Sequence, residues 1–212
     1  MLARDAVQEL LAPFGVVPSD VAIDSLLVYL ELLLRWNRKI NLTSISTAEE
    51  CVTRHFGESF LASKSVQLQG TLLDVGSGAG FPGLALKLIA PDLDVTLLEP
   101  VAKKRAFLKE VARACNMSHV NISGSRLEEF STRQQASSFD IITVRAVGHL
   151  ESLVQVASGL LKREGHLCLW VGRQQVPEIR QSNPGLAWMA PVAIPASMER
   201  QILVGARCDE ED

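Results

Sequence analysis

The sequence lacks the features that mark a membrane, secreted or metal-binding protein. Its 212 residues contain no apolar run of about 18 residues, the length that a membrane-spanning helix needs. Acidic residues interrupt the start of the chain, where a signal peptide would have its apolar segment. The cysteines are scattered without a Cys-x-x-Cys pair, at Cys51, Cys115, Cys168 and Cys208. We therefore expect a cytoplasmic protein with reduced thiols, no metal site and no membrane contact.

An excess of positive charge is also missing. The chain has 21 Lys and Arg against 24 Asp and Glu, a net charge of -3, which excludes a protein held to nucleic acid by bulk charge but leaves room for a local basic patch. A hydrophobic content of 47% is typical of a folded globular protein. The length favours one large domain or one domain with a small appendage. Nothing indicates an obligate oligomer, so we expect a monomer.

The beginning of the chain is predicted to be helical. Apolar residues recur at three- and four-residue steps over Leu26–Leu34, which is typical of a buried helical stripe. Ser19 or Asp20 is the expected N-cap of this helix. A further helix is expected over residues 47–63. The chain is therefore divided into an N-terminal helical extension and a core domain, residues 1–66 and residues 67–212.

Strands and helices alternate in the rest of the chain. Strands are expected at residues 71–75, 94–99, 119–123, 139–145 and 166–171. Helices are expected at residues 83–90, 101–115 and 149–162. Because the strands are apolar on both faces, the pattern predicts an α/β, three-layer Rossmann-like fold with a mostly parallel sheet. Residues 186–194 and 201–206 leave no room for a crossover helix and should form an antiparallel C-terminal hairpin at one edge.

The most informative segment is the glycine-rich run 74–83, DVGSGAGFPG, which follows the first expected strand. Its glycines permit backbone angles that a β-carbon forbids, and it falls where open parallel sheets bind ligands. The run fits the dinucleotide fingerprint Gly-x-Gly-x-x-Gly. However, Asp74 would repel a pyrophosphate and would favour the α-amino group of S-adenosylmethionine. Glu99, at the end of the second strand, could accept ribose hydroxyls of either cofactor, and a purely structural loop is the third interpretation.

Two further positions lie at the same rim of the predicted sheet. Arg145 ends the fourth strand, where it could orient a cofactor carboxylate or a nucleic-acid phosphate, or form a surface salt bridge. After the third strand, Ser125 and Glu128 have the spacing of a capping box. The same segment could contact an adenine, with Leu127 covering the ring. His55 is expected to be a hydrogen-bonded packing residue rather than a catalyst.

Basic residues occur in short clusters. Each cluster is compatible with a solvated face, but in a net-acidic chain they together indicate a local RNA site. The candidate RNA-binding residues are Arg38, Arg54, Lys103, Lys104, Arg105, Arg126 and Arg173.

These residues and motifs resemble those of the glucose-inhibited division protein B family (GidB, also called RsmG), small-subunit ribosomal RNA methyltransferases. The resemblance covers nearly the whole chain. The glycine loop is shared by many methyltransferases, whereas the N-terminal elements are more specific. The matching elements are Trp36-Asn37, Asn41-Leu42-Thr43, Arg54-His55 with Ser59, residues 74–83, Leu97-Leu98-Glu99, Lys104-Arg105 with Phe107-Leu108, residues 125–130 and Arg145-Ala146.

The resemblance implies methyl transfer from S-adenosylmethionine to N7 of one guanine in a loop of 16S ribosomal RNA, with the RNA or the small subunit as partner and no role for DNA. Guanine N7 carries a free lone pair, so alignment suffices and no catalytic dyad is expected. Arg145 is the best candidate for a catalytic residue. The cofactor-binding residues are expected to be Asp74, Gly76, Ser77, Gly78, Phe81, Glu99, Leu127, Glu128 and Arg145.

The chain departs from the family pattern at three places. Glu58 stands where the family usually has Asp, and Glu99-Pro100 replaces Asp-Ser. Val171 replaces a lysine at the end of the fifth strand, with Arg173 as the nearest substitute. The alternatives are a methyltransferase of a small molecule or protein, and a non-catalytic protein that binds S-adenosylmethionine or RNA.

Overall fold

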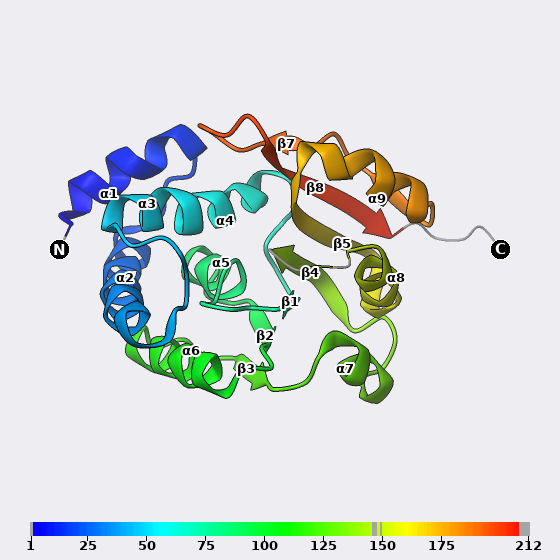
Figure 1. Ribbon diagram of the computed structural model, residues 1–212, viewed down its shortest axis with the longest axis horizontal. Helices are drawn as coiled ribbons and strands as arrows, with labels where there is room; N and C mark the ends of the chain where they lie inside the picture. Colours follow the sequence, from blue (N-terminus) through cyan, green and yellow to red (C-terminus); the bar gives the residue numbers. More distant parts are fainter. Residues whose placement is uncertain (1, 146–147, 149, 208–212) are drawn as a thin grey trace.

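The computed structural model describes residues 2–145, 148 and 150–207 (Figure 1). The α-helices are α1 Arg4–Leu11, α2 Asp20–Ile40, α3 Ala48–Cys51, α4 Glu58–Phe60, α5 Gly83–Ile89, α6 Ala102–Ala114, α7 Leu127–Arg133, α8 Leu150–Leu160 and α9 Val176–Ser182. A π-helix, Val52–Gly57, joins α3 to α4, and a 3-10 turn, Leu61–Lys64, follows α4, so the helix expected over residues 47–63 is present with changes in its winding. The strands are β1 Thr71–Val75, β2 Asp94–Leu98, β3 Val120–Ser123, β4 Phe139–Arg145, β5 Leu161–Gly172, β6 Leu186–Trp188, β7 Val192–Ala193 and β8 Arg200–Arg207. Within these ranges, no helix is long and apolar enough to cross a membrane.

The strands form one sheet in the order β3-β2-β1-β4-β5-β8-β6, and β7 also pairs with β8. The first five strands of this order are parallel, and β8 runs antiparallel to β5, β6 and β7. Figure 1 shows α2, α5 and α6 on one side of the sheet and α7, α8 and α9 on the other. The predicted three-layer α/β fold with its antiparallel C-terminal strands is therefore confirmed.

Helices cover both faces of the sheet, and neighbouring residues on a strand point to opposite faces, so both sets of strand side chains are buried. Leu72 belongs to a core cluster shared with the N-terminal helices, whereas Leu73 packs in a second cluster beneath α7, α8 and α9. The N-terminal helices bury their apolar stripe in the first cluster, including Ile23 and Leu26. The side chain of Ser19 accepts a hydrogen bond from the N–H of Ala22, at 3.3 Å, which confirms the predicted N-cap.

Three details differ from the sequence-based expectations. Leu161 and Lys162 begin β5 instead of ending a helix, because Leu161 pairs with Phe139 and the Lys162 ammonium lies 2.8 Å from the Asp140 carboxylate. Helix α9 has no counterpart among the expected helices. The C-terminal hairpin is confirmed, but its first run is divided into β6 and β7, which both pair with β8.

The described cysteines are free thiols, as expected: Cys51, Cys115 and Cys168. Two sequence-based expectations concern residues outside the described ranges, namely the thiol of Cys208 and the start of a helix at His149.

Candidate active site

The glycine loop connects β1 to α5 at the carboxyl end of the parallel strands. Gly76, Gly78 and Gly80 have φ angles of 71°, 56° and 87°, in the left-handed region that favours glycine. The N–H groups of Gly76 and Ser77 donate to the carbonyl of Leu98, at 2.9 and 3.0 Å. The loop is thus tied to the end of β2, and the predicted need for glycine is confirmed.

The N-terminal helices hold the glycine loop from one side. The buried hydroxyl of Tyr29 on α2 donates to the carbonyl of Ala79. A β-carbon at Gly80 would overlap this hydroxyl. The ring of Phe81 stacks on Tyr29 at a centroid distance of 5.2 Å and on His55 at 4.6 Å. Phe81 therefore links the loop to the helices, and a cofactor contact from this residue would have to come from its backbone.

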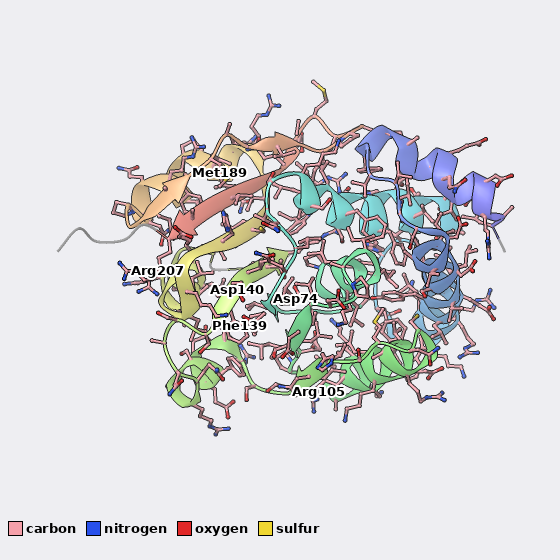
Figure 2. The ribbon with its side chains drawn as sticks, turned by 180° about the vertical axis from the view of Figure 1, so that it is seen from behind. Asp74, Arg105, Phe139, Asp140, Met189 and Arg207 are labelled. Carbon is pink, nitrogen blue, oxygen red and sulfur yellow. The ribbon has the colours of Figure 1, made fainter. Side chains whose placement is uncertain are left out.

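Asp74 is the buried acid of the site. It lies on β1 and is fully buried in the interior of the fold (Figure 2). The hydroxyl of Thr143 on β4 donates to its Oδ1, at 2.8 Å, whereas its Oδ2 has no hydrogen-bond partner. Burial raises the pKa of Asp74 to about 6. Near neutral pH the site therefore contains a desolvated, mostly ionised carboxylate.

Glu99 follows β2 and is 4% exposed. Its Oε2 accepts a hydrogen bond from the N–H of Gly78, at 2.9 Å, and its Oε1 accepts one from the N–H of Val101, at 2.8 Å. Each carboxylate oxygen can accept a second hydrogen bond. Glu99 thus fixes the shape of the loop and keeps acceptor capacity for a ligand hydroxyl.

Arg105 lies on α6 beside this strand end (Figure 2). Its Nη1 donates to the carbonyls of Glu99 and Pro100, at 2.9 and 2.6 Å. The guanidinium is therefore engaged with the protein backbone, which the basic cluster in the sequence did not indicate.

The segment after β3 differs from the capping-box expectation. Helix α7 begins at Leu127, with Arg126 as N-cap and no side-chain cap hydrogen bond, so the expected box between Ser125 and Glu128 is wrong. The helix begins too late in the sequence for Ser125 to occupy the N-cap position. Leu127 is 3% exposed, in the second core cluster, and Glu128 is exposed in the first turn of the helix.

Arg145 ends β4 and takes part in a buried ionic cluster. Its Nη2 donates to the carbonyl of Arg54, at 2.6 Å, and to Oε2 of Glu58, at 3.1 Å. Its Nη1 is buried without a partner. Oε1 of Glu58 lies 2.7 Å from Nη1 of Arg200 and 3.9 Å from Nε of Arg54. The salt bridge, one of the sequence-based interpretations of Arg145, is therefore present, but it is buried and not at the surface, because the side chain of Glu58 is 3% exposed.

Sequence reasoning missed the participation of Glu58 and Arg200 in this cluster. In the sequence, Glu58 stands out only as a departure from the family pattern. Arg200 begins β8 opposite Gly172 at the end of β5, so the strand pairing brings it to the rim. No periodicity or motif around Arg200 signals this position.

His55 is confirmed as a packing residue. Its Nε2 lies 2.9 Å from the hydroxyl of Thr43, and Thr43 is held through its backbone by the side-chain amide of Asn37, with N···O distances of 2.9 Å in both directions. Burial lowers the pKa of His55 to about 3. The imidazole is therefore neutral at physiological pH. The family-like residues of the N-terminal helices thus support the loop through Phe81.

The remaining RNA candidates are more exposed. Arg38, Lys103, Arg126 and Arg173 are exposed, and Lys104 is half-buried. Val171 is 3% exposed, in the second core cluster, so the position that carries a lysine in the family pattern is apolar and buried here. Of the described residues, no group of His, Cys, Asp and Glu could hold a metal ion.

This fold, with its glycine loop at the carboxyl ends of parallel strands, is the Rossmann-like fold of solved S-adenosylmethionine-dependent methyltransferases. A SAM-dependent methyltransferase from Aquifex aeolicus superposes with a TM-score of 0.60 over 74% of this chain and 93% of that chain. The two sequences are only 14% identical, so this similarity concerns the fold.

Sequence comparison defines the family. A family model for rRNA small subunit methyltransferase G (GidB) matches residues 22–200. A ribosomal RNA small subunit methyltransferase G from Alkaliphilus metalliredigens is 37% identical over 186 residues, which covers 86% of this chain and 76% of that protein. The protein of the same name from Xylella fastidiosa strain 9a5c is 38% identical over 187 residues, 88% of this chain and 84% of that protein. The chain belongs to the rRNA small subunit methyltransferase G family.

Proposed function

We propose that this methyltransferase transfers the methyl group of S-adenosylmethionine to N7 of a guanine in a loop of 16S ribosomal RNA. The observation that carries the cofactor part is a pair of buried, unpartnered atoms, Oδ2 of Asp74 and Nη1 of Arg145. They come from the neighbouring strands β1 and β4. The methionine end of the cofactor carries an ammonium and a carboxylate, which would satisfy the acceptor and the donor respectively.

A dinucleotide suits this site less well. The carboxylate of Asp74 lies beside the glycine loop, where a pyrophosphate would have to bind, and like charges at short range repel strongly in a dry site. Gly76, Ser77 and Gly78 would line the ribose end through their backbone, and Glu99 would accept hydrogen bonds from the ribose hydroxyls, because the N–H groups of these three residues are already bonded to Leu98 and Glu99. Leu127 and Glu128 would flank the adenine, and Phe81 would act through its backbone.

The bound cofactor supplies the chemistry, a methyl group activated on a sulfonium. Guanine N7 has a free lone pair at neutral pH, so the protein needs no general base to expose it. Asp74 and Arg145 would fix the cofactor, and the rigid loop held by Tyr29 and Glu99 would prevent its displacement. Catalysis would then rest on alignment of the two reactants, with Arg145 as the best candidate for a catalytic residue.

The exposed basic residues would bind the RNA phosphates. They are Arg38, Arg54, Lys103, Arg126 and Arg173, together with the half-buried Lys104. The guanidinium of Arg105 is less available to a phosphate than these side chains, because it is hydrogen-bonded to the backbone of Glu99 and Pro100. RNA sequence is read mainly in loops with unstacked bases, which supports a single-stranded target. The proposal includes a cytoplasmic monomer that binds neither DNA nor membranes, with residues 1–66 as an extension of the methyltransferase domain at 67–212.

Methyl transfer from tritium-labelled S-adenosylmethionine to small-subunit RNA that lacks the modification tests the function. Primer extension after N7-specific strand cleavage identifies the base. We expect one labelled guanine in the wild type and none with Asp74→Asn or Arg145→Gln, whereas Arg133→Gln, an exposed change outside the site, should retain the activity. Calorimetry should give binding of S-adenosylmethionine and not of NAD. Label in a small molecule or protein but not in RNA would refute the proposal.

A further inference from the structure

We propose that Glu58 is a positioning residue that holds Arg54 and Arg200 together as a clasp for one phosphate of the RNA substrate. The clasp comprises these three residues, Glu58, Arg54 and Arg200. The inference rests on the proposed function and adds Arg200, from the last strand of the sheet, to the RNA-binding residues.

The charges around Glu58 do not balance. One carboxylate with 3% side-chain exposure faces the guanidinium groups of Arg54, Arg145 and Arg200. Buried charges are stable only when they are paired. If Arg145 serves the cofactor carboxylate, two guanidinium groups still share a single oxygen, Oε1 of Glu58, at 3.9 and 2.7 Å. Their mutual repulsion would be relieved by one further anion.

The two arginines of the clasp can reach solvent, unlike Arg145. The side chains of Arg54 and Arg200 are 46% and 34% exposed, against 14% for Arg145. A ligand that binds them therefore approaches from the surface of the protein. Arginine presents paired donors that match the oxygens of a phosphate. A phosphate of the RNA chain fits this position, and it would lie next to the cofactor site because Arg145 binds the other oxygen of Glu58.

Hydrogen bonds hold Glu58 and Arg200 of the clasp in place. The indole N–H of Trp170 on β5 donates to the carbonyl of Glu58, at 2.9 Å. The backbone N–H and the Nε of Arg200 both approach the hydroxyl of Ser197, at 3.1 and 3.2 Å. Trp170 pairs with Arg145 across the sheet, and Gly172 pairs with Arg200. The sheet thus fixes the distance between the proposed cofactor arginine and the proposed phosphate arginine.

Replacing Arg200 tests the clasp with little disturbance of the cofactor site. Arg200→Gln is compared with Arg133→Gln, which removes an exposed arginine paired only with Glu129 on its own helix. We expect Arg200→Gln to raise the KM for RNA on the order of tenfold, with a much smaller change in kcat. The slope of log affinity against log salt should fall by about 0.7 to 1. The affinity for S-adenosylmethionine without RNA should stay within about twofold of the wild type.

Two substitutions of Glu58 test whether its carboxylate positions the arginines of the clasp. Glu58→Gln should weaken RNA binding and also cofactor binding, because it releases Arg145. Glu58→Asp keeps the charge on a shorter side chain and should restore part of both. Thermal unfolding of each variant identifies any that fails to fold. If a Glu58 variant does not fold, the comparison of Arg200→Gln with Arg133→Gln tests the clasp by itself.

The outcomes are distinct. Equal RNA affinity and equal salt slope for Arg200→Gln and Arg133→Gln would overturn the clasp while leaving the methyltransferase proposal intact. A loss of cofactor affinity equal to the loss of RNA affinity in Arg200→Gln would assign Arg200 to the cofactor carboxylate and also overturn it. Equilibrium RNA binding is measured directly by anisotropy, so the clasp is tested even if methyl transfer fails. A wild type that binds no RNA would refute both proposals.

Discussion

Replacing Asp74 with asparagine should alter the pH dependence of folding in a predictable direction. Burial raises the pKa of Asp74 from its ordinary value of 3.8 to about 6, so the folded protein binds a proton on this carboxyl more tightly than the unfolded chain. The protonated carboxyl therefore stabilises the folded state at low pH. This contribution is fully present below the unfolded value and is lost as pH rises through about 6.

The magnitude follows from the two pKa values. A difference of this size corresponds to about 3 kcal/mol in the free energy of unfolding, of which about 2 kcal/mol should be lost between pH 4.5 and 7.5. Asparagine does not titrate and can still accept the hydrogen bond from Thr143. Relative to the Asp74→Asn variant, the wild type should therefore become less stable by about 2 kcal/mol over this range.

Urea unfolding of both proteins at a series of pH values, without cofactor, measures this difference and cancels the titration of all other groups. Asp140→Asn is the matched control. Although partial burial raises the pKa of Asp140, hydrogen bonds from Lys162 and Thr71 lower it overall. Its contribution to stability is therefore lost only as pH falls below the unfolded value of 3.8, so its difference curve should be nearly flat between pH 4.5 and 7.5 and have the opposite sign at lower pH. A difference for Asp74 that does not change with pH would refute the argument. The cofactor affinity of the wild type should also increase as pH rises through about 6, and that of the Asp74→Asn variant should not.

Three further predictions concern the loop and the basic surface. Gly80→Ala should destabilise the protein by roughly 2 kcal/mol and abolish cofactor binding, because the φ angle is positive and the new methyl group would overlap the Tyr29 hydroxyl. The control Gly159→Ala, with open space around the new methyl group, should change the free energy of unfolding by less than about 1 kcal/mol. Equal losses of stability in the two variants would contradict this prediction. Tyr29→Phe should cost about 1 to 2 kcal/mol in urea unfolding, since it leaves a buried carbonyl unpaired; an unchanged midpoint would argue against the bond. A double Lys103→Gln and Lys104→Gln variant should reduce the salt dependence of RNA binding by about 1 to 2 in slope without changing cofactor affinity, and a uniform loss of both would indicate misfolding.

The order of the secondary structure was predictable because each element carries its own local signal. Alternating apolar strands and amphipathic helices gave β1 and β4 at their observed bounds. The start of β5 was not predictable, because the segment at Leu161 has helical character and becomes a strand only through pairing with Phe139. Helix α9 is short, and its two buried side chains, Val176 and Ile179, give little periodic signal.

The glycine loop and its acids could likewise be identified from the sequence. Adjacent residues determine where a chain must turn and where a carboxylate follows a buried strand, so Asp74 was assigned correctly to the end of a strand beside the loop. The local context could not show that one oxygen of Asp74 is unpaired, since its partner Thr143 lies 69 residues away in the chain.

The ionic cluster depended entirely on the tertiary structure. Glu58, Arg145 and Arg200 come from a short helix, a parallel strand and an antiparallel strand. The pairing of the sheet and the packing of α4 against it bring both arginines within hydrogen-bond distance of Glu58. The same holds for Tyr29, whose hydroxyl reaches a carbonyl 50 residues away. Local patterns thus determined the elements and the loop. The charge arrangement at the rim was decided by long-range packing, because electrostatic interactions depend on distance in space and leave no periodic pattern in the chain.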